Sequence, residues 1–286
     1  ESNLPVSHWT PTELAQEAKK RGTVEKISPR QVDRLLREAR LRPHKSQYWL
    51  TSKDKREDPV QYHADVGRVC ATYQRAPELA EEGAHVISTD EKTGMQAIQR
   101  LHETKPVRPG LVERVEFEYI RHGTLSLIAN LDVATGRVIS PAIGSTRTEN
   151  DFVASIERTV DTDPNRIFIF IVDQLNTHKS ASLVEMVARR CGIEHDLGVK
   201  GKSGVLKSQK TRRAFLEDES HRIRFVYTPR HCSWLNQVEI WFSILARRLL
   251  RRSSFASCDE LRTRVLAFID YFNAVLAKPF KWTYQG

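Results

Sequence analysis

Six consecutive apolar residues, Ile167 to Val172, constrain the fold more than any other feature of this 286-residue chain. A short run of branched and aromatic residues is typical of a strand that is buried on both faces of a sheet. The run is followed at once by an acidic residue, Asp173. The sequence therefore predicts a central strand with helices on both sides and a carboxylate at its end.

Strand and helix patterns alternate around this run, and the strand pattern at 85–90 also ends in an acid. We expect strands over 85–90, 115–131, 138–139 and 223–227, with turns at His122-Gly123 and Thr135-Gly136. We expect helices over 149–160, 180–190 and 258–276, and a long helix that Ser233 caps. This order predicts an α/β domain over residues 83–286, in which helices flank a mixed sheet.

The first 50 residues have the pattern of a small all-α unit. Residues 10–13 (Thr-Pro-Thr-Glu) and 28–31 (Ser-Pro-Arg-Gln) both have the form of a capping box with proline at the first helical position. Two short helices, the second rich in arginine, fit a helix-turn-helix DNA-binding domain over 1–50, but a helical hairpin packed on the main domain fits as well. Residues 42–49 resemble a basic arm. Residues 51–82 resemble a polar linker, over 51–60, and a longer helix at about 58–80.

The net charge of +9 is concentrated in one segment of the chain. Leu197 to Arg252 holds 13 Lys and Arg against 4 Asp and Glu, so the rest of the chain is balanced. Such an excess favours a polyanionic partner such as double-stranded DNA, with a solvated basic face as the alternative. The candidate DNA-binding residues are Arg30, Arg34, Arg37, Lys45, Lys200, Lys202, Lys207, Arg212, Arg213, Arg230 and His231.

The bulk composition argues against a membrane or secreted protein. Mean hydropathy is −0.49, and no apolar run approaches the ~20 residues that a membrane span requires. The first residues lack the pattern of a secretory signal, and the four cysteines have neither metal-site nor disulfide-framework spacing. We therefore expect reduced thiols and a cytoplasmic location without a membrane partner.

Three acids have the placement that a metal site for phosphoryl transfer requires. Mg²⁺ prefers oxygen ligands, and two ions about 3.5–4 Å apart can hold the attacking and leaving oxygens of a phosphate. Asp90 and Asp173 each follow a strand, while Glu239 lies among apolar neighbours on the helix after the last strand. A carboxylate there is costly unless a cation or an arginine pairs with it. We predict that these three acids bind metal and catalyse the reaction, with Asn236 and His178 in support, although His178 also fits a purely structural role.

Three segments resemble the catalytic motifs of the mariner superfamily of transposases, in its bacterial insertion-sequence-630 branch. They are residues 88–93 around Asp90, 172–179 around Asp173 and 227–242 around Glu239, and the likeness extends over nearly the whole chain. The resemblance implies a ribonuclease-H-like core, two Mg²⁺ or Mn²⁺ ions, cleavage at transposon ends, and strand transfer into target DNA at TA sites. It also implies a homodimer on the terminal inverted repeats and a nucleoid-associated location.

Two features depart from that family. Gln174 stands where the family often has Asn, and the interval of 66 positions from Asp173 to Glu239 is longer than usual. We interpret the extra length, about 196–220, as a basic insertion on the DNA-binding side. Its Gly-Lys-Ser-Gly segment lacks the spacing and the preceding strand of a phosphate-binding loop. The start of the chain resembles the second half of a two-part DNA-binding region, so a truncated or naturally shorter form is expected.

Two other functions are compatible with the same residues. One is a ribonuclease-H-like DNA endonuclease that cuts without joining. The other is a domesticated DNA-binding protein that is catalytically silent, against which the intact set of three acids argues.

Overall fold

The computed structural model describes residues 8–46 and 52–284, and the chain divides into two compact units, Glu1–Thr51 and Ser52–Gly286. The first unit contains the two helices that the sequence predicts, α1 (Pro11–Lys20) and α2 (Pro29–Glu38). In each, the cap hydroxyl of Thr10 or Ser28 accepts from the backbone N–H three residues later, and the side chain at that later position accepts from the cap N–H. These reciprocal bonds satisfy donors that every helix leaves open at its start. Both predicted helix starts are confirmed.

The junction between the units differs from the predicted linker. Residues 47–51, the end of the predicted basic arm and the first residue of the linker, lie outside the described residues. A short helix, α3 (Lys53–Glu57), then occupies part of the predicted linker. The linker prediction is wrong there because a tertiary contact holds this polar turn: Asp54 accepts a 3.0 Å hydrogen bond from the backbone N–H of Arg230. The longer helix follows as α4 (Pro59–Glu81), capped by Asp58.

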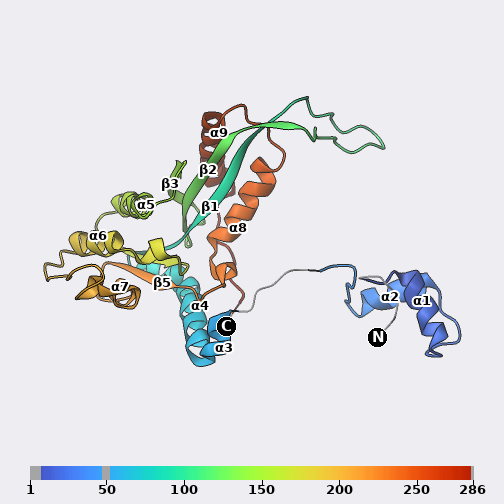
Figure 1. Ribbon diagram of the computed structural model, residues 1–286, viewed down its shortest axis with the longest axis horizontal. Coiled ribbons are helices and arrows are strands. Elements are labelled where there is room, and N and C mark those ends of the chain that lie inside the picture. Colours follow the sequence, from blue (N-terminus) through green and yellow to red (C-terminus); the bar gives the residue numbers. More distant parts are fainter. Residues whose placement is uncertain (1–7, 47–51, 285–286) are drawn as a thin grey trace. The chain divides into compact units, whose positions relative to one another are not determined.

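In the described part of the larger unit, five strands form one mixed sheet in the order β3-β2-β1-β4-β5 (Figure 1). They are β1 (Ala84–Arg100), β2 (Tyr119–Asp132), β3 (Val138–Gly144), β4 (Ile167–Val172) and β5 (Ile223–Tyr227). The first three form an antiparallel meander, whereas β4 runs parallel to both β1 and β5. The mixed α/β architecture predicted from the sequence is confirmed.

Helices cover both faces of this sheet. α5 (Glu149–Asp161), α6 (Ala181–Cys191) and α7 (Gln209–Leu216) contribute to the core on one face; α4, α8 (Val238–Leu245) and α9 (Cys258–Tyr271) pack on the other. Shorter helical turns lie at Asn176–Lys179, Val205–Lys207 and Ser233–Leu235, and α8 and α9 continue as the π-helical turns Ala246–Leu250 and Phe272–Leu276. The apolar run of β4 serves both layers, because Phe168 and Phe170 face α5 and α6 while Ile169 and Ile171 face α4. No helix among the described segments has both the length and the apolar composition needed to cross a bilayer, and the four cysteines are unpaired thiols.

β1 is longer than the sequence pattern indicates, and β2 is not interrupted at the predicted turn. β1 continues ten residues beyond Asp90, and the predicted turn at His122-Gly123 lies inside β2, where Gly123 pairs with Ala97 beside an irregularity in the register. The turn prediction is wrong because glycine here serves close packing: a Cβ on Gly123 would lie 2.7 Å from the Sγ of Cys258. The two strands continue beyond the sheet into an extended hairpin over 101–118, held by isolated bridges (Figure 1).

The predicted turn at Thr135-Gly136 is confirmed, and it makes a testable contribution to stability. Gly136 has φ +71°, and a Cβ at this position would lie 2.1 Å from the carbonyl oxygen of Lys278. Gly94 has nearly the same φ, +69°, with no atom within 4 Å of such a Cβ. Urea unfolding should show that Gly136→Ala lowers the free energy of unfolding by about 1–3 kcal/mol more than Gly94→Ala, since only the former adds a backbone clash to the left-handed strain. Equal losses would contradict a rigid contact between this turn and the carboxy-terminal segment.

Candidate active site

The parallel pairing of β1 with β4 brings two of the three predicted acids level with each other. Ser88 is the register partner of Ile171, so the same register two residues further on aligns Asp90 with Asp173. The sequence pattern placed Asp90 at the end of a strand, but Asp90 lies within β1. Asp173 directly follows β4, as predicted. Strand geometry thus fixes both carboxylates at the carboxyl end of β4.

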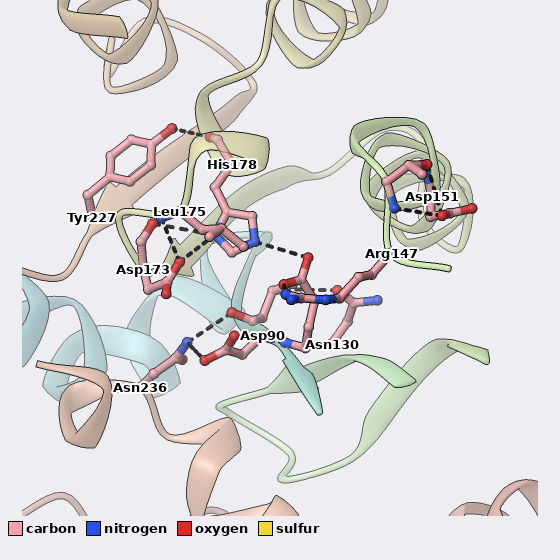
Figure 2. Close-up of polar contacts among 12 residues, drawn as sticks. Asp90, Asn130, Arg147, Asp151, Asp173, Leu175, His178, Tyr227 and Asn236 are labelled. Carbon is pink, nitrogen blue, oxygen red and sulfur yellow. Dashed lines mark hydrogen bonds and ion pairs between the residues drawn. The ribbon is translucent and has the colours of Figure 1, made fainter. Parts of the chain in front are cut away.

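Asp90 is buried, with 8% of its surface exposed, and it is held by hydrogen bonds. The backbone N–H of Glu91 donates to Oδ1 at 2.7 Å, and Nδ2 of Asn236 donates to Oδ2 at 3.3 Å and to the carbonyl of Thr89 at 2.9 Å. Ser88 Oγ in turn donates to Oδ1 of Asn236 and accepts from the N–H that begins α8. Figure 2 shows Asn236 directed at Asp90. The predicted supporting role of Asn236 therefore has a definite geometry.

Burial and neighbouring negative charge act together on Asp90. Loss of solvent, the charge of Asp173 and, less strongly, the charge of Glu239 raise the pKa of Asp90 from 3.8 to about 7. A carboxyl group beside other carboxylates resists ionisation unless a cation compensates. The three acids that the sequence singled out are therefore electrostatic neighbours in the folded chain.

Asp173 has the opposite environment because His178 faces it. The two side chains meet at 2.7 Å through Nδ1 and Oδ1 (Figure 2). Burial alone would raise the pKa of Asp173, but the hydrogen bond and the charge of His178 outweigh burial and lower it. Burial would lower the pKa of His178, yet Asp173 and Glu91 together raise it to about 9. The imidazolium thus keeps Asp173 ionised next to Asp90.

Glu91 is a member of the site that sequence reasoning missed. Its side chain is 3% exposed, with Oε1 3.5 Å from Nε2 of His178 and Oε2 3.9 Å from Arg147. Side chains alternate across a strand, so Glu91 faces the α5 side of β1 while Asp90 faces the α8 side. The ring of Phe152 from α5 packs on His178, with centroids 4.2 Å apart. An acid immediately after Asp90 in a buried strand was the signal available in the sequence.

Glu239 occupies a different part of its helix from the predicted one. Ser233 begins a separate 3₁₀ turn, and α8 starts only at Val238, so Glu239 lies in the first helical turn rather than six residues after a cap at Ser233. The predicted Ser233 cap is wrong because Asn236, between the two segments, is extended and bonded to β1. Burial raises the pKa of Glu239, Lys92 lowers it, and Asp173 raises it. The first turn of a helix is also where a carboxylate is favoured by the helix dipole.

The predicted basic insertion, 196–220, packs against the segment that carries Asp173. Leu206 and the end of α7 join the core on the α6 side. Arg212 donates from Nε to the carbonyl of Lys179 at 2.6 Å and from Nη1 to that of Leu206 at 3.0 Å. Gln209 donates to Asn176 at 2.8 Å. This segment therefore supports the turn between Asp173 and α6.

The predicted DNA contacts divide into two groups by exposure. Arg212 bonds to backbone carbonyls, and Arg213 pairs with Glu217 at 2.9 Å and with Asp65 at 3.5 Å. We do not retain these two as DNA contacts, because their side chains are only partly exposed and are bonded within the protein. The others are exposed: Lys200, Lys202, Lys207, Arg230 and His231 in the larger unit, and Arg30, Arg34, Arg37 and Lys45 in the smaller one. The exposed candidates are therefore divided between the two units of the chain.

Comparison with protein families identifies the domain that holds these carboxylates. The family model described as DDE superfamily endonuclease matches residues 85–262, more than half of the chain and a range that includes Asp90, Asp173 and Glu239. The chain belongs to the DDE superfamily of endonucleases. No curated protein matches it significantly in sequence.

Several solved structures have a fold similar to that of this DDE chain. The Mos1 mariner paired-end complex with Mn has a TM-score of 0.55 and 14% identity, over 93% of this chain and 67% of that one. A pre-cleavage Mos1 transpososome has a TM-score of 0.53 and 13% identity, over 96% and 74%. The Mos1 strand transfer complex has a TM-score of 0.51 and 13% identity, over 93% and 66%. At these identities the likeness shows the fold, and the predicted ribonuclease-H-like core is confirmed.

The donor chemistry of this DDE site fits a divalent metal ion. Carboxylate oxygens are the ligands that Mg²⁺ and Mn²⁺ prefer. Burial and the charge of Asp173 raise the pKa of Asp90, and a divalent cation bound to these carboxylates would offset both effects. Among the described residues, no three metal-ligating side chains already converge at coordination distance. Asp90, Asp173 and Glu239 are the carboxylates that this site offers.

Proposed function

We propose that this protein is a metal-dependent DNA transposase of the mariner superfamily, in its insertion-sequence-630 branch. The observation that supports this most directly is the electrostatic coupling of Asp90 with Asp173 and Glu239 at the carboxyl end of β4. The proposed reaction is cleavage of DNA at transposon ends followed by strand transfer into target DNA at TA sites.

Two Mg²⁺ or Mn²⁺ ions, when bound, would activate the attacking oxygen and stabilise the leaving one. The residues of the chain act by positioning. Asn236 fixes the orientation of the Asp90 carboxylate, and His178 keeps Asp173 ionised and oriented. Glu239 enters from the start of α8, so the three ligands derive from elements that the core holds rigidly. Phosphoryl transfer relies on positioning and electrostatics and needs no covalent enzyme intermediate.

DNA contacts are proposed for the exposed cations of both units. Lys200, Lys202, Lys207, Arg230 and His231 would bind phosphates next to the catalytic residues, while α2 would enter the major groove as the second helix of a helix-turn-helix. Arg30, Arg34 and Arg37 project from that helix or its start, and Lys45 lies beyond it. A homodimer that bridges two terminal inverted repeats is proposed from the family resemblance. A protein with this partner would act in the compartment that holds the DNA.

A strand-transfer assay separates the proposed function from endonuclease activity alone. Linear DNA with pre-cut 3′-hydroxyl ends is incubated with supercoiled target plasmid and Mn²⁺. We expect joined products whose insertion sites are TA dinucleotides. Nicked or linearised plasmid without joining would identify an endonuclease instead. Binding of DNA without any Mn²⁺-dependent product, together with no Mn²⁺ binding by calorimetry, would identify a catalytically silent DNA-binding protein.

A further inference from the structure

An exposed aromatic pair, Trp234 and Tyr284, lies on the surface, and Trp234 is two residues before Asn236 of the candidate active site. Trp234 is 50% exposed and Tyr284 is 42% exposed, in contrast to the fully buried Trp241 of α8. Their ring centroids are 4.9 Å apart and their planes make an angle of 85°. This edge-on contact restricts how the Trp234 ring can turn while half of its surface stays open to solvent.

Trp234 belongs to the loop that connects β5 to α8 and reaches Asp90. Two of its neighbours anchor this loop: Leu235 is fully buried, and Cys232 is buried with its Sγ 3.6 Å from the hydroxyl of Tyr62. Asn236, only two residues after Trp234, donates to the Asp90 carboxylate. An exposed indole on an anchored loop that also bonds to Asp90 is a feature that core packing does not require.

The same loop contains a residue in a strained conformation. His231 has φ +60°, a left-handed value that costs a non-glycine residue free energy. Strain of this kind persists where the surrounding structure enforces it, and it is concentrated at functional sites. Here the left-handed residue lies three positions before Trp234, so the turn it makes helps to set where the indole projects.

Basic residues lie close in sequence to each member of the aromatic pair. Arg230 and His231 of the same loop are exposed, as is Lys281, three residues before Tyr284. Lys55 of α3 lies over the ring of Tyr62 at 5.8 Å, and Asp54 of α3 partly offsets Arg230 at 3.9 Å. A flat aromatic surface among cations matches a nucleotide, because the base stacks on the ring while the phosphate meets the charges.

We propose that Trp234, held edge-on by Tyr284, stacks on an unpaired nucleobase of the DNA strand end that enters the carboxylate site. This inference rests on the proposed function, from which it takes DNA as the partner, and adds a specific contact to it. The alternative occupant is a second protein molecule. The basic residues nearby in sequence and the small apolar area of two side chains favour a nucleotide, since stable protein interfaces bury a far larger surface.

The experiment compares two fluorescent DNA duplexes that differ only in a short single-stranded 3′ overhang containing 2-aminopurine. Binding is measured by anisotropy in EDTA, so that no cleavage occurs. We expect the wild-type chain to bind the overhang duplex roughly tenfold more tightly than the blunt one, as base–aromatic stacking allows. The 2-aminopurine emission should be quenched on binding. Trp234→Ala should lose both the preference and the quenching while it binds the blunt duplex as the wild type does, and Trp234→Phe should retain most of the preference.

Phe117→Ala is the matched control, because Phe117 is an aromatic residue with 86% exposure on the hairpin over 101–118. It should leave the overhang preference unchanged. The proposal is overturned if Trp234→Ala keeps the preference for the overhang duplex. A change in the sedimentation of the DNA-free protein, with that preference kept, would identify the aromatic pair as a protein–protein contact instead. Mn²⁺-dependent cleavage of the same duplexes is measured separately. Loss of the overhang preference in Trp234→Ala would support stacking even if the wild type showed no cleavage. Cleavage by the wild type, together with an unchanged preference in Trp234→Ala, would contradict only the stacking proposal.

Discussion

Asp173→Asn is expected to reduce Mn²⁺-dependent DNA cleavage by roughly 10³-fold or more while DNA binding in EDTA is unchanged. The amide keeps the size of the carboxylate but removes the charge that attracts the metal and that pairs with His178 at 2.7 Å. A metal ion contributes several kcal/mol of transition-state stabilisation, and each 1.36 kcal/mol corresponds to tenfold in rate. The measurement is a plasmid-nicking time course, with anisotropy titrations on the same preparations.

Asp270→Asn is the matched control for this prediction, since Asp270 is an exposed aspartate on α9. It should nick the plasmid at the wild-type rate. Wild-type cleavage by Asp173→Asn would show that this carboxylate is no metal ligand. A joint loss of cleavage and DNA binding would mean that the substitution disrupted the turn between β4 and α6 rather than the metal site alone.

The features that local sequence determines were predicted from it. The apolar run of β4 requires burial on both faces, and this alone indicated helices on either side of a sheet and a carboxylate at the end of the strand. The capping boxes at Thr10 and Ser28 are complete within four residues, so both helix starts were readable. Asp90 and Asp173 could be paired as candidates because each belongs to a strand pattern.

The features that depend on contacts between distant segments were not predicted. The start of α8 is delayed because Asn236 bonds to β1, about 146 positions earlier in the chain. Arg212 was interpreted as a DNA contact from its charge, but its partner is a carbonyl 33 positions away. No role for Glu91 was evident in the sequence, because its partner His178 lies 87 positions later and meets it on the face of β1 opposite to Asp90. In each case the deciding hydrogen bond or ion pair joins residues that the sequence does not place together.

Asp90→Asn is expected to make the metal-free protein more stable than the wild type at pH 8, by on the order of 2–4 kcal/mol. Burial and the charge of Asp173 raise the pKa of Asp90 from 3.8 to about 7 in the folded chain. Between these two values the folded state binds more protons than the unfolded state, so the free energy of unfolding falls as pH rises. The stability that the protonated Asp90 carboxyl group contributes is fully present below about pH 4 and is lost once pH exceeds about 7. Because the amide of Asp90→Asn does not ionise, the free energy of unfolding of this variant does not fall in this way.

Divalent metal should stabilise the wild type but not Asp90→Asn, and this difference in response is the decisive part of the test. Saturating Mn²⁺ stabilises a folded chain that binds it, by about 2.7 kcal/mol at a hundredfold excess over Kd. The wild type should gain this in urea unfolding at pH 8, and gain less at pH 6, where protons compete with the metal for Asp90. Asp90→Asn should gain little at either pH, whereas the control Asp270→Asn should follow the wild type throughout. Equal stabilisation of the wild type and Asp90→Asn by Mn²⁺ would mean that Asp90 does not bind the metal. A carboxylate that is a metal ligand must contribute to the stabilisation, so its removal must reduce it.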